Sequence, residues 1–211
     1  MKNFPFLLLL LCFLACKFDS KEKPFTPNTG DASKEIANWT CTPGKQIGLI
    51  QKNATEAAII KLYGQENVIR KEIGMGEGET TMATIIFPET KNEMVITWKT
   101  GQPFKVIENI LVDKKDAPWT TASGIHIGTT LEELVKINGK EFQFAGFEWD
   151  NSGYTNEWMD GNISKNVIVY LEPNNPEVVY PDLLGDELFS SNLPTAKAAD
   201  LKVRALVFSF E

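Results

Sequence analysis

The sequence predicts a mixed α+β fold built from two similar units in tandem. A helix-like segment occurs twice along the 211 residues, and after each copy the hydrophobic spacing changes from helical to strand-like. A helix followed by an antiparallel meander, repeated once, is an α+β arrangement. Hydrophobic residues make up 43% of the chain, which is ample for a packed core.

The repeated segment aligns residues 55–66 with residues 130–141 and has the marks of a short helix. A threonine at each start suits a helix N-cap, and a glycine near each end suits a left-handed C-cap. We therefore expect one helix of about ten residues in each half. The identical pairs are Thr55/Thr130, Lys61/Lys136, Gly64/Gly139 and Glu66/Glu141.

Strand-like segments follow each helix. In the first half they are residues 67–73, 81–87, 94–98 and 105–112. In the second half they are residues 142–149, 154–159, 167–171 and 201–210. Each unit should therefore be a short helix plus an antiparallel sheet of about four strands, with the first unit over residues 39–121 and the second over residues 122–211.

The strand predicted over residues 142–149 is the most hydrophobic of the second half. It would carry Trp149 into the core, with a bulge at Gly146. Residues 172–199 hold four prolines and should form a long excursion before the last strand.

The N-terminus has the features of a signal for export. Lys2 precedes an apolar run over residues 4–15, which is too short to span a bilayer, since a span needs about 20 residues. The run ends in Phe13-Leu14-Ala15-Cys16, which resembles the lipobox of bacterial lipoproteins. The resemblance implies that residues 1–15 are removed and that Cys16 is acylated. The alternative is an ordinary secretory signal in which Cys16 is incidental.

Residues 16–38 are expected to form the lipidated cysteine and a flexible linker, because residues 17–38 are polar, contain proline and glycine, and lack apolar periodicity. Several acyl chains at Cys16 would hold the protein on a membrane. By resemblance to the sorting rule of Gram-negative lipoproteins, Lys17 favours the outer membrane if the organism has one. The expected location is therefore the cell envelope.

Cysteine content and charge exclude several classes of protein. Once Cys12 is removed and Cys16 acylated, Cys41 is the one thiol left, so no intramolecular disulfide is expected. We expect Cys41 to be a small buried residue. The formal charge of -7 argues against a nucleic-acid surface. No cofactor or metal site is predicted.

Three acidic residues suggest an alternative, catalytic function. Asp150, Glu157 and Asp160 lie close in sequence and could form a carboxylate pair of a surface hydrolase acting on glycan or peptide. A turn joining two strands is the simpler explanation. His126 has no nucleophile motif beside it and is expected to be structural or at the surface. Residues 74–79 are glycine-rich and are expected to form a turn rather than a phosphate loop.

Aromatic residues are the candidates for partner binding. Trp119, Trp149, Tyr154 and Trp158 could fill a core or anchor a protein or sugar. We interpret Trp149 as core, and Tyr154 and Trp158 as possible surface anchors for a partner.

Two resemblances bear on function. The segment from Gly128 to Gly139 resembles the helix start of beta-lactamase-inhibitor-like and outer-membrane-assembly lipoprotein repeats. Residues 47–56, 76–79 and 145–150 resemble stretches of uncharacterised bacterial lipoproteins, which implies no activity. We therefore expect a membrane-anchored lipoprotein that is a non-catalytic binding or structural module of the envelope, with a protein or cell-wall partner.

Overall fold

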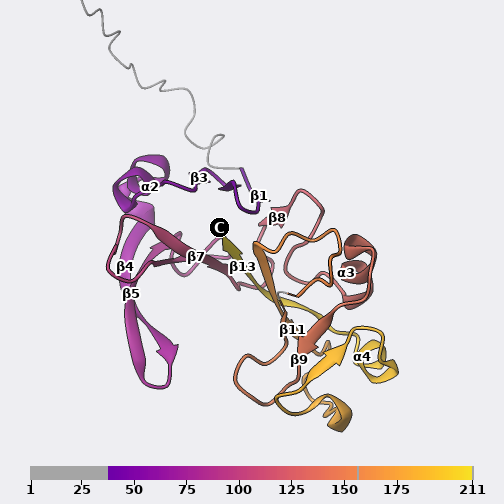
Figure 1. Ribbon diagram of the computed structural model, residues 1–211. Coiled ribbons are helices and arrows are strands. Elements are labelled where there is room, and N and C mark those ends of the chain that lie inside the picture. Colours follow the sequence, from indigo (N-terminus) through magenta and orange to yellow (C-terminus); the bar gives the residue numbers. More distant parts are fainter. Residues whose placement is uncertain (1–37, 156, 211) are drawn as a thin grey trace, which may run out of the picture. The chain divides into compact units, whose positions relative to one another are not determined.

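The computed structural model describes residues 38–155 and 157–210, which form a mixed α+β structure (Figure 1). Sheets dominate it, with three α-helices in the described residues. The predicted signal peptide, Cys16 and nearly all of the predicted linker lie outside the described residues. The predicted α+β class is confirmed.

A seven-stranded antiparallel sheet holds strands from both halves of the chain. The two halves join where β7 pairs with β13, with Leu111 opposite Val207. The first half supplies four strands and the second half three, so the two halves share one sheet rather than forming one sheet each. In sheet order, the strands are β10 (Tyr154–Thr155), β11 (Val167–Glu172), β13 (Lys202–Ser209), β7 (Ile107–Val112), β6 (Met94–Trp98), β5 (Glu79–Ile86) and β4 (Val68–Gly76).

Smaller elements provide the side chains that pack with this sheet in the core. Side chains of β1, β2, β3, α2 and α3 share a single hydrophobic cluster with Ile96, Ile110 and Leu206 of the large sheet. A four-stranded sheet has the order β3 (Ile50–Gln51), β2 (Gln46–Ile47), β1 (Thr40–Thr42) and β8 (Thr120–Thr121). The other elements are α2 (Glu56–Tyr63), η1 (Gln65–Asn67), α3 (Leu131–Asn138), β9 (Gln143–Ala145), η2 (Pro181–Leu183), β12 (Leu188–Ser190) and α4 (Pro194–Ala198).

Both predicted helices begin at their predicted caps. The Thr55 side chain accepts a hydrogen bond from the Ala58 amide, and Thr130 forms a reciprocal capping box with Glu133. Gly139 ends α3 in the left-handed conformation, as predicted. Gly64 has φ 87° but ψ 143°, so the left-handed C-cap predicted there is wrong, because the chain turns directly into η1.

The strand predicted over residues 142–149 is shorter than expected. It ends at Ala145. The next residue, Gly146, lies so close to Gly185 that a Cβ on Gly146 would be 2.4 Å from the Gly185 carbonyl oxygen. Glu148 then adopts φ 67°, which turns the chain outward. Trp149 is consequently 62% exposed, and its predicted place in the core is wrong.

Trp158 is the reverse case. It is 4% exposed, its indole N–H donates to the Val167 carbonyl at 3.0 Å, and its ring meets Phe142 edge-on at 5.0 Å. Its predicted role as a surface anchor is therefore wrong. Of the strand predicted over residues 154–159, only β10 is present, because the strand ends at Thr155. Trp158 lies beyond this end and is therefore able to point into the core.

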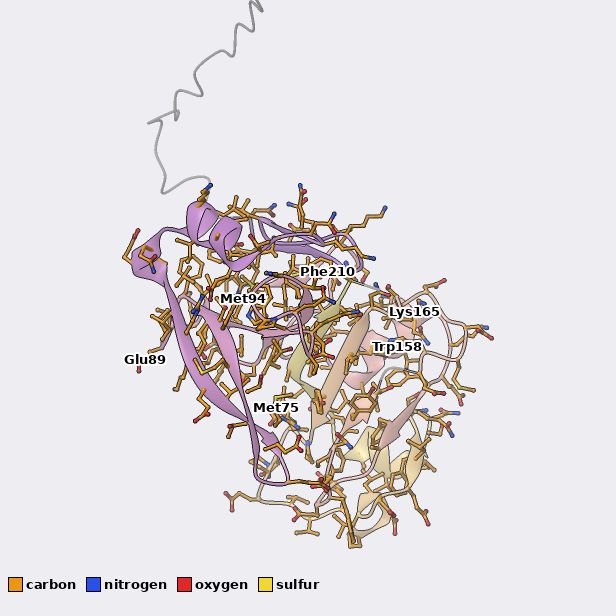
Figure 2. The ribbon with its side chains drawn as sticks, turned by 60° about the vertical axis from the view of Figure 1, so that its left-hand side comes forward. Met75, Glu89, Met94, Trp158, Lys165 and Phe210 are labelled. Carbon is orange, nitrogen blue, oxygen red and sulfur yellow. The ribbon has the colours of Figure 1, made fainter. Side chains whose placement is uncertain are left out.

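The β4–β5 hairpin extends beyond the rest of the sheet (Figure 1). Of the residues of β5, only 84–86 pair with β6, so residues 71–83 form a two-stranded ribbon. Glu77 and Gly78 close it with φ 49° and 80°, the positive values of a type I′ turn. This confirms the predicted turn within residues 74–79. Figure 2 shows Met75, which is 53% exposed, near the end of the ribbon.

Candidate binding surface

One row of aliphatic side chains crosses six strands of the large sheet. Each residue is the direct cross-strand partner of the next, so all of them lie on one face. At about 4.8 Å between strands, the row is about 24 Å long. We call this row and the sheet surface around it the open face. From β4 to β11 the row is Ile69, Ile85, Val95, Leu111, Val207 and Ile168.

The open face is opposite the core. Alternate residues of the same strands, such as Ile96, Ile110 and Leu206, are fully buried in the core. None of the row's six residues belongs to the core cluster or to the side chains packed against it. Ile69 is 41% exposed, Ile85 is buried, and the other four are half-buried. The row is thus apolar surface that the described chain leaves partly open to solvent.

A groove of about 390 Å³ runs along four residues of the row, which are Val95, Leu111, Val207 and Ile168. Side chains of β6, β7, β13 and β11 line it, together with Ile73 and Met75 of the ribbon. Ribbon and sheet therefore enclose the same groove. Asp113 and Arg204 are the charged residues of its lining, so the lining carries no net charge although the protein as a whole is acidic.

Two tyrosines and an arginine mark the β10–β11 end of the open face. Tyr154 and Tyr170 are cross-strand partners with ring centroids 5.5 Å apart, and the Arg204 guanidinium lies 4.9 Å from the Tyr170 centroid. Arg204 also donates to the Ser152 carbonyl at 3.2 Å. Burial raises the pKa of Tyr154, and the neighbouring Tyr170 and Glu157 raise it further, so its hydroxyl stays protonated at neutral pH. Tyr154, a predicted partner-binding residue, thus lies on the open face.

The three acidic residues of the predicted hydrolase do not form a site. Asp150, Glu157 and Asp160 are all exposed. Asp150 lies in the turn before β10, Glu157 in the connection after it, and Asp160 in the following turn with φ 56°. The grooves and pockets described here are lined by other residues. This arrangement gives no concave site with two carboxylates.

Cys41 and His126 have the structural environments expected of them. Cys41 is fully buried, and burial raises the pKa of its thiol to about 12, so the thiol stays protonated at neutral pH. His126 is exposed, and its Nδ1 lies 2.8 Å from the Gly124 carbonyl oxygen. In residues 38–155 and 157–210, no three His, Cys, Asp or Glu side chains are grouped to hold a metal.

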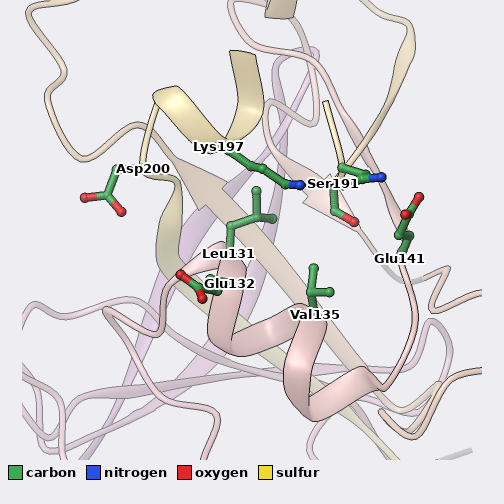
Figure 3. Close-up of a pocket in the computed structure, with 8 residues that line it drawn as sticks. Leu131, Glu132, Val135, Glu141, Ser191, Lys197 and Asp200 are labelled. Carbon is green, nitrogen blue, oxygen red and sulfur yellow. Dashed lines mark hydrogen bonds between the residues drawn. The ribbon is translucent and has the colours of Figure 1, made fainter. Parts of the chain in front are cut away.

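A second cavity, of about 450 Å³, lies between α3 and α4 (Figure 3). Leu131 and Val135 of α3 give it an apolar side, and Lys197 of α4 faces it from across. The Lys197 ammonium is hydrogen-bonded to the Asn192 side chain, and Asp200 accepts from Asn174 at 2.9 Å. Both charged groups are thus hydrogen-bonded to asparagine side chains, and these pairings provide no nucleophile with a neighbouring base.

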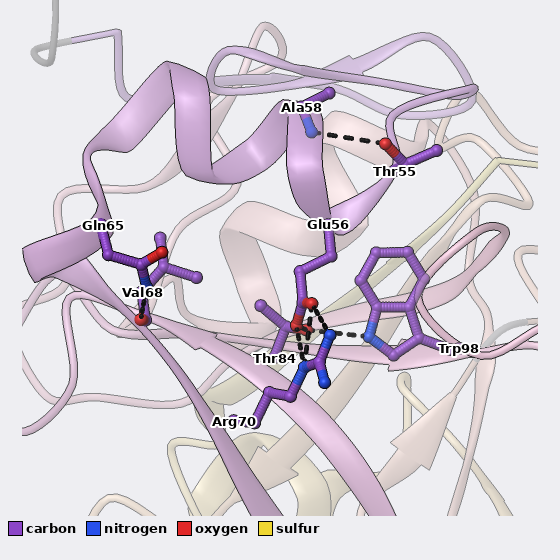
Figure 4. Close-up of polar contacts among 8 residues, drawn as sticks. All are labelled: Thr55, Glu56, Ala58, Gln65, Val68, Arg70, Thr84 and Trp98. Carbon is purple, nitrogen blue, oxygen red and sulfur yellow. Dashed lines mark hydrogen bonds and ion pairs between the residues drawn. The ribbon is translucent and has the colours of Figure 1, made fainter.

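A polar network holds the base of the ribbon against α2 (Figure 4). The Glu56 carboxylate is 5% exposed and accepts hydrogen bonds from the Arg70 guanidinium and, at 2.7 Å, from the Thr84 hydroxyl. The Thr84 oxygen in turn accepts from the Trp98 indole N–H at 3.0 Å. Arg70 also lies 3.8 Å from the Phe104 ring centroid. Burial opposes the Glu56 charge, but these hydrogen bonds and the Arg70 charge outweigh it, so the pKa of Glu56 is lowered.

Comparisons with known proteins add no relative. No protein-family model matches the chain, and neither curated proteins nor solved structures give a significant match. None of the helices in the described residues is long and apolar enough to pass through a membrane. The open face, rather than a known relative, is therefore the basis for considering function.

Sequence reasoning missed the open face, although the sequence holds a signal for it. An antiparallel sheet with one solvated face normally alternates apolar and polar residues. Four strand segments are instead continuous apolar runs, namely residues 94–96, 110–112, 167–171 and 206–208. Such runs place apolar side chains on both faces of the sheet, and this departure from alternation would have identified Val95, Leu111 and Val207.

Proposed function

We propose that this protein is a lipid-anchored lipoprotein of the bacterial envelope that binds another protein through the open face of its sheet. The aliphatic row is the observation that carries the proposal. Half-buried apolar side chains on a continuous surface are typical of protein interaction sites. The neutral lining of the groove favours an apolar segment over a highly charged one.

The side chains of the row favour a protein over a glycan as partner. Sugars are recognised by exposed aromatic rings with polar groups beside them, whereas the row is aliphatic across six strands. Tyr154 and Tyr170 meet each other edge-on at one end and extend the apolar row. Nothing in the arrangement of Asp150, Glu157 and Asp160 favours a hydrolase, and we do not propose one.

The lipid anchor leads to a prediction for Cys16. In Cys16→Ser the thiol that would be acylated is gone, so lipid labelling and membrane retention should both be lost. Labelling with a palmitate analogue, followed by separation of membrane and soluble fractions, measures both. Cys41→Ser is the control and should keep the label, because its thiol is buried. A labelled Cys16→Ser protein would contradict the anchor.

The binding function is tested by photo-crosslinking in living cells. A photoreactive amino acid at Leu111, in the middle of the row, should give covalent adducts with a discrete protein partner. The same amino acid at Lys61, exposed on α2 away from the row, should give few. Leu111→Glu should reduce adducts at position 95 by at least about tenfold, since it places a charge in the apolar contact. Equal adducts at Leu111 and Lys61, or none at either, would overturn the proposal.

We also propose that the two halves are tandem copies of one unit. The first amide of each helix donates to a carbonyl just before the last strand of its half: Glu56 to Phe104 at 3.0 Å, and Leu131 to Leu201 at 2.7 Å. Those last strands, β7 and β13, pair with each other, as do β1 and β8 ahead of the helices. In this alignment Leu131 of the second half corresponds to Glu56 of the first. If the halves are copies, the fold should tolerate leucine at position 56, provided that Arg70 is also replaced by an apolar residue.

A further inference from the structure

β4 is the longer of the two free edges of the large sheet. The opposite edge, β10, has two residues, whereas β4 has nine. The Phe87 amide donates to the Asn67 carbonyl at 2.8 Å, which fixes the alternation of hydrogen bonds between β4 and β5. The N–H and C=O groups of residues 68, 70, 72 and 74 therefore point away from β5. No other described segment pairs with this edge.

This edge has only part of the protection that free edges usually have. Proteins usually block a free edge with proline, bulges, or charged side chains. Here Arg70 is turned toward Glu56 and over the Phe104 ring, so Lys71 and Glu72 are the charges left on the edge. The one irregularity is at residues 74–76, near the turn. A two-stranded ribbon is marginally stable alone, and a third strand would complete it.

We propose that a second copy of this chain pairs with β4 in antiparallel orientation, about a two-fold axis at Ile73. The charged residues of β4 and the length of the paired segment select this axis: at Ile73, residues 70–76 of the two copies pair and no like charges are directly opposite, whereas axes at Ile69 or Gly74 pair fewer residues of the strand. An axis at Arg70, Lys71 or Glu72 would place each of these residues directly opposite its own copy, and like charges in that position are destabilising.

At Ile73 the direct contact is between two isoleucines instead. Glu72 then faces Gly74 of the second copy, and Lys71 faces Met75 with Glu77 diagonal to it. The lysine and the diagonal glutamate are complementary charges within reach of each other. Ile73 itself is half-buried and Met75 is 53% exposed in the single chain, so pairing would cover apolar surface.

The same axis suits two chains tethered to one membrane. A two-fold axis perpendicular to the sheet keeps both open faces on one side and both core sides on the other. The described chain begins at Asn38, which donates to the Gly48 carbonyl at 3.3 Å in the layer on the core side. Both linkers would thus start on the same side. This step rests on the proposed lipid anchor, whereas the pairing of the edges does not.

Disulfide trapping in the full chain tests the register. With Cys12→Ser and Cys16→Ser, the buried Cys41 is the only native thiol. Ile73→Cys should then give a disulfide-linked dimer under mild oxidation, because facing residues of a non-hydrogen-bonded pair have Cα atoms about 4.5 Å apart. Lys71→Cys is the matched control: its thiols would be displaced by four residues, or about 13 Å, and should not link. Thr81→Cys, on β5 directly across the ribbon from Ile73, is a second control.

The association itself is measured by analytical ultracentrifugation of the same chain without an added cysteine. A concentration-dependent dimer is expected, and Ile73→Lys should weaken it about tenfold by placing like charges at the axis. A monomer at all concentrations, or disulfide formation at Lys71→Cys or Thr81→Cys as rapid as at Ile73→Cys, would overturn the proposal. Loss of photo-crosslinks at Leu111 would overturn the binding function and leave this dimer unaffected.

Discussion

Trp158→Ala is expected to lower the free energy of unfolding by about 3–5 kcal/mol, the range for removing a large aromatic residue from a core. The side chain is 4% exposed, and Phe142 packs against it. Its backbone carbonyl also accepts from the Asn138 side chain at 2.9 Å, which ties this segment to α3. A cavity here would loosen both contacts. Urea unfolding followed by circular dichroism measures the change.

Trp149→Ala is the matched comparison, since it removes the same side chain nine residues earlier. Trp149 is 62% exposed, so its loss should change stability by no more than about 0.5 kcal/mol. Equal losses in the two variants would contradict the burial described here. A folded Trp158→Ala protein that had lost only its partner would instead support the original prediction of a surface anchor.

These two tryptophans show what the sequence could determine. Local signals were reliable: both threonine caps, β6 over residues 94–98 and the glycine-rich turn are where the pattern placed them. Each depends on neighbours within a few residues of the chain. Whether Trp149 and Trp158 are buried depends instead on contacts between residues far apart in the sequence. For Trp149 the contact is between Gly146 and Gly185, and for Trp158 it is the hydrogen bond from the Asn138 side chain. A strand pattern contains neither contact.

The sheet itself was predicted less completely than its strands. The strands of both halves were largely recognised, but their union through β7 and β13 was not, because pairing order depends on which edges meet in space. The short strands β1, β2, β3, β8 and β12 have two or three residues each, too few for alternation to show. The open face was missed for the same reason, because its row of side chains forms only when the strands of both halves lie side by side in one sheet.

The Glu56 network predicts how stability responds to acid. Its pKa is lowered in the folded protein, below an unfolded value of about 4.3. The unfolded chain therefore binds the proton more readily, and the contribution of Glu56 is fully present above that pH and is lost as pH falls through the folded pKa. In Glu56→Gln this part of the acid sensitivity should disappear, which urea midpoints between pH 7 and pH 3 would show.

Arg70→Met should reverse the sign of that dependence. Burial is the largest single influence on Glu56 and raises its pKa, and without Arg70 only the Thr84 hydrogen bond opposes it. The folded pKa then lies above the unfolded one, so the variant should lose stability as pH rises through it, whereas the native protein gains. Lys71→Met, the adjacent residue on the same strand, should keep the native direction. If Arg70→Met kept that direction too, Arg70 would not be what holds the charge of Glu56.

The double variant Glu56→Leu/Arg70→Met separates the charge from the packing. Glu56 is buried, whereas the Arg70 side chain is 54% exposed. Replacing both partners of such a pair with apolar residues is often neutral, whereas removing Arg70 alone leaves the buried carboxylate without compensation. The double variant should therefore be more stable at pH 7 than Arg70→Met, and its midpoint should no longer follow the titration of residue 56. Leu131 already occupies the corresponding place on α3, where it is buried. A double variant less stable than Arg70→Met would mean that the site needs a carboxylate, and that the two helix starts are not equivalent.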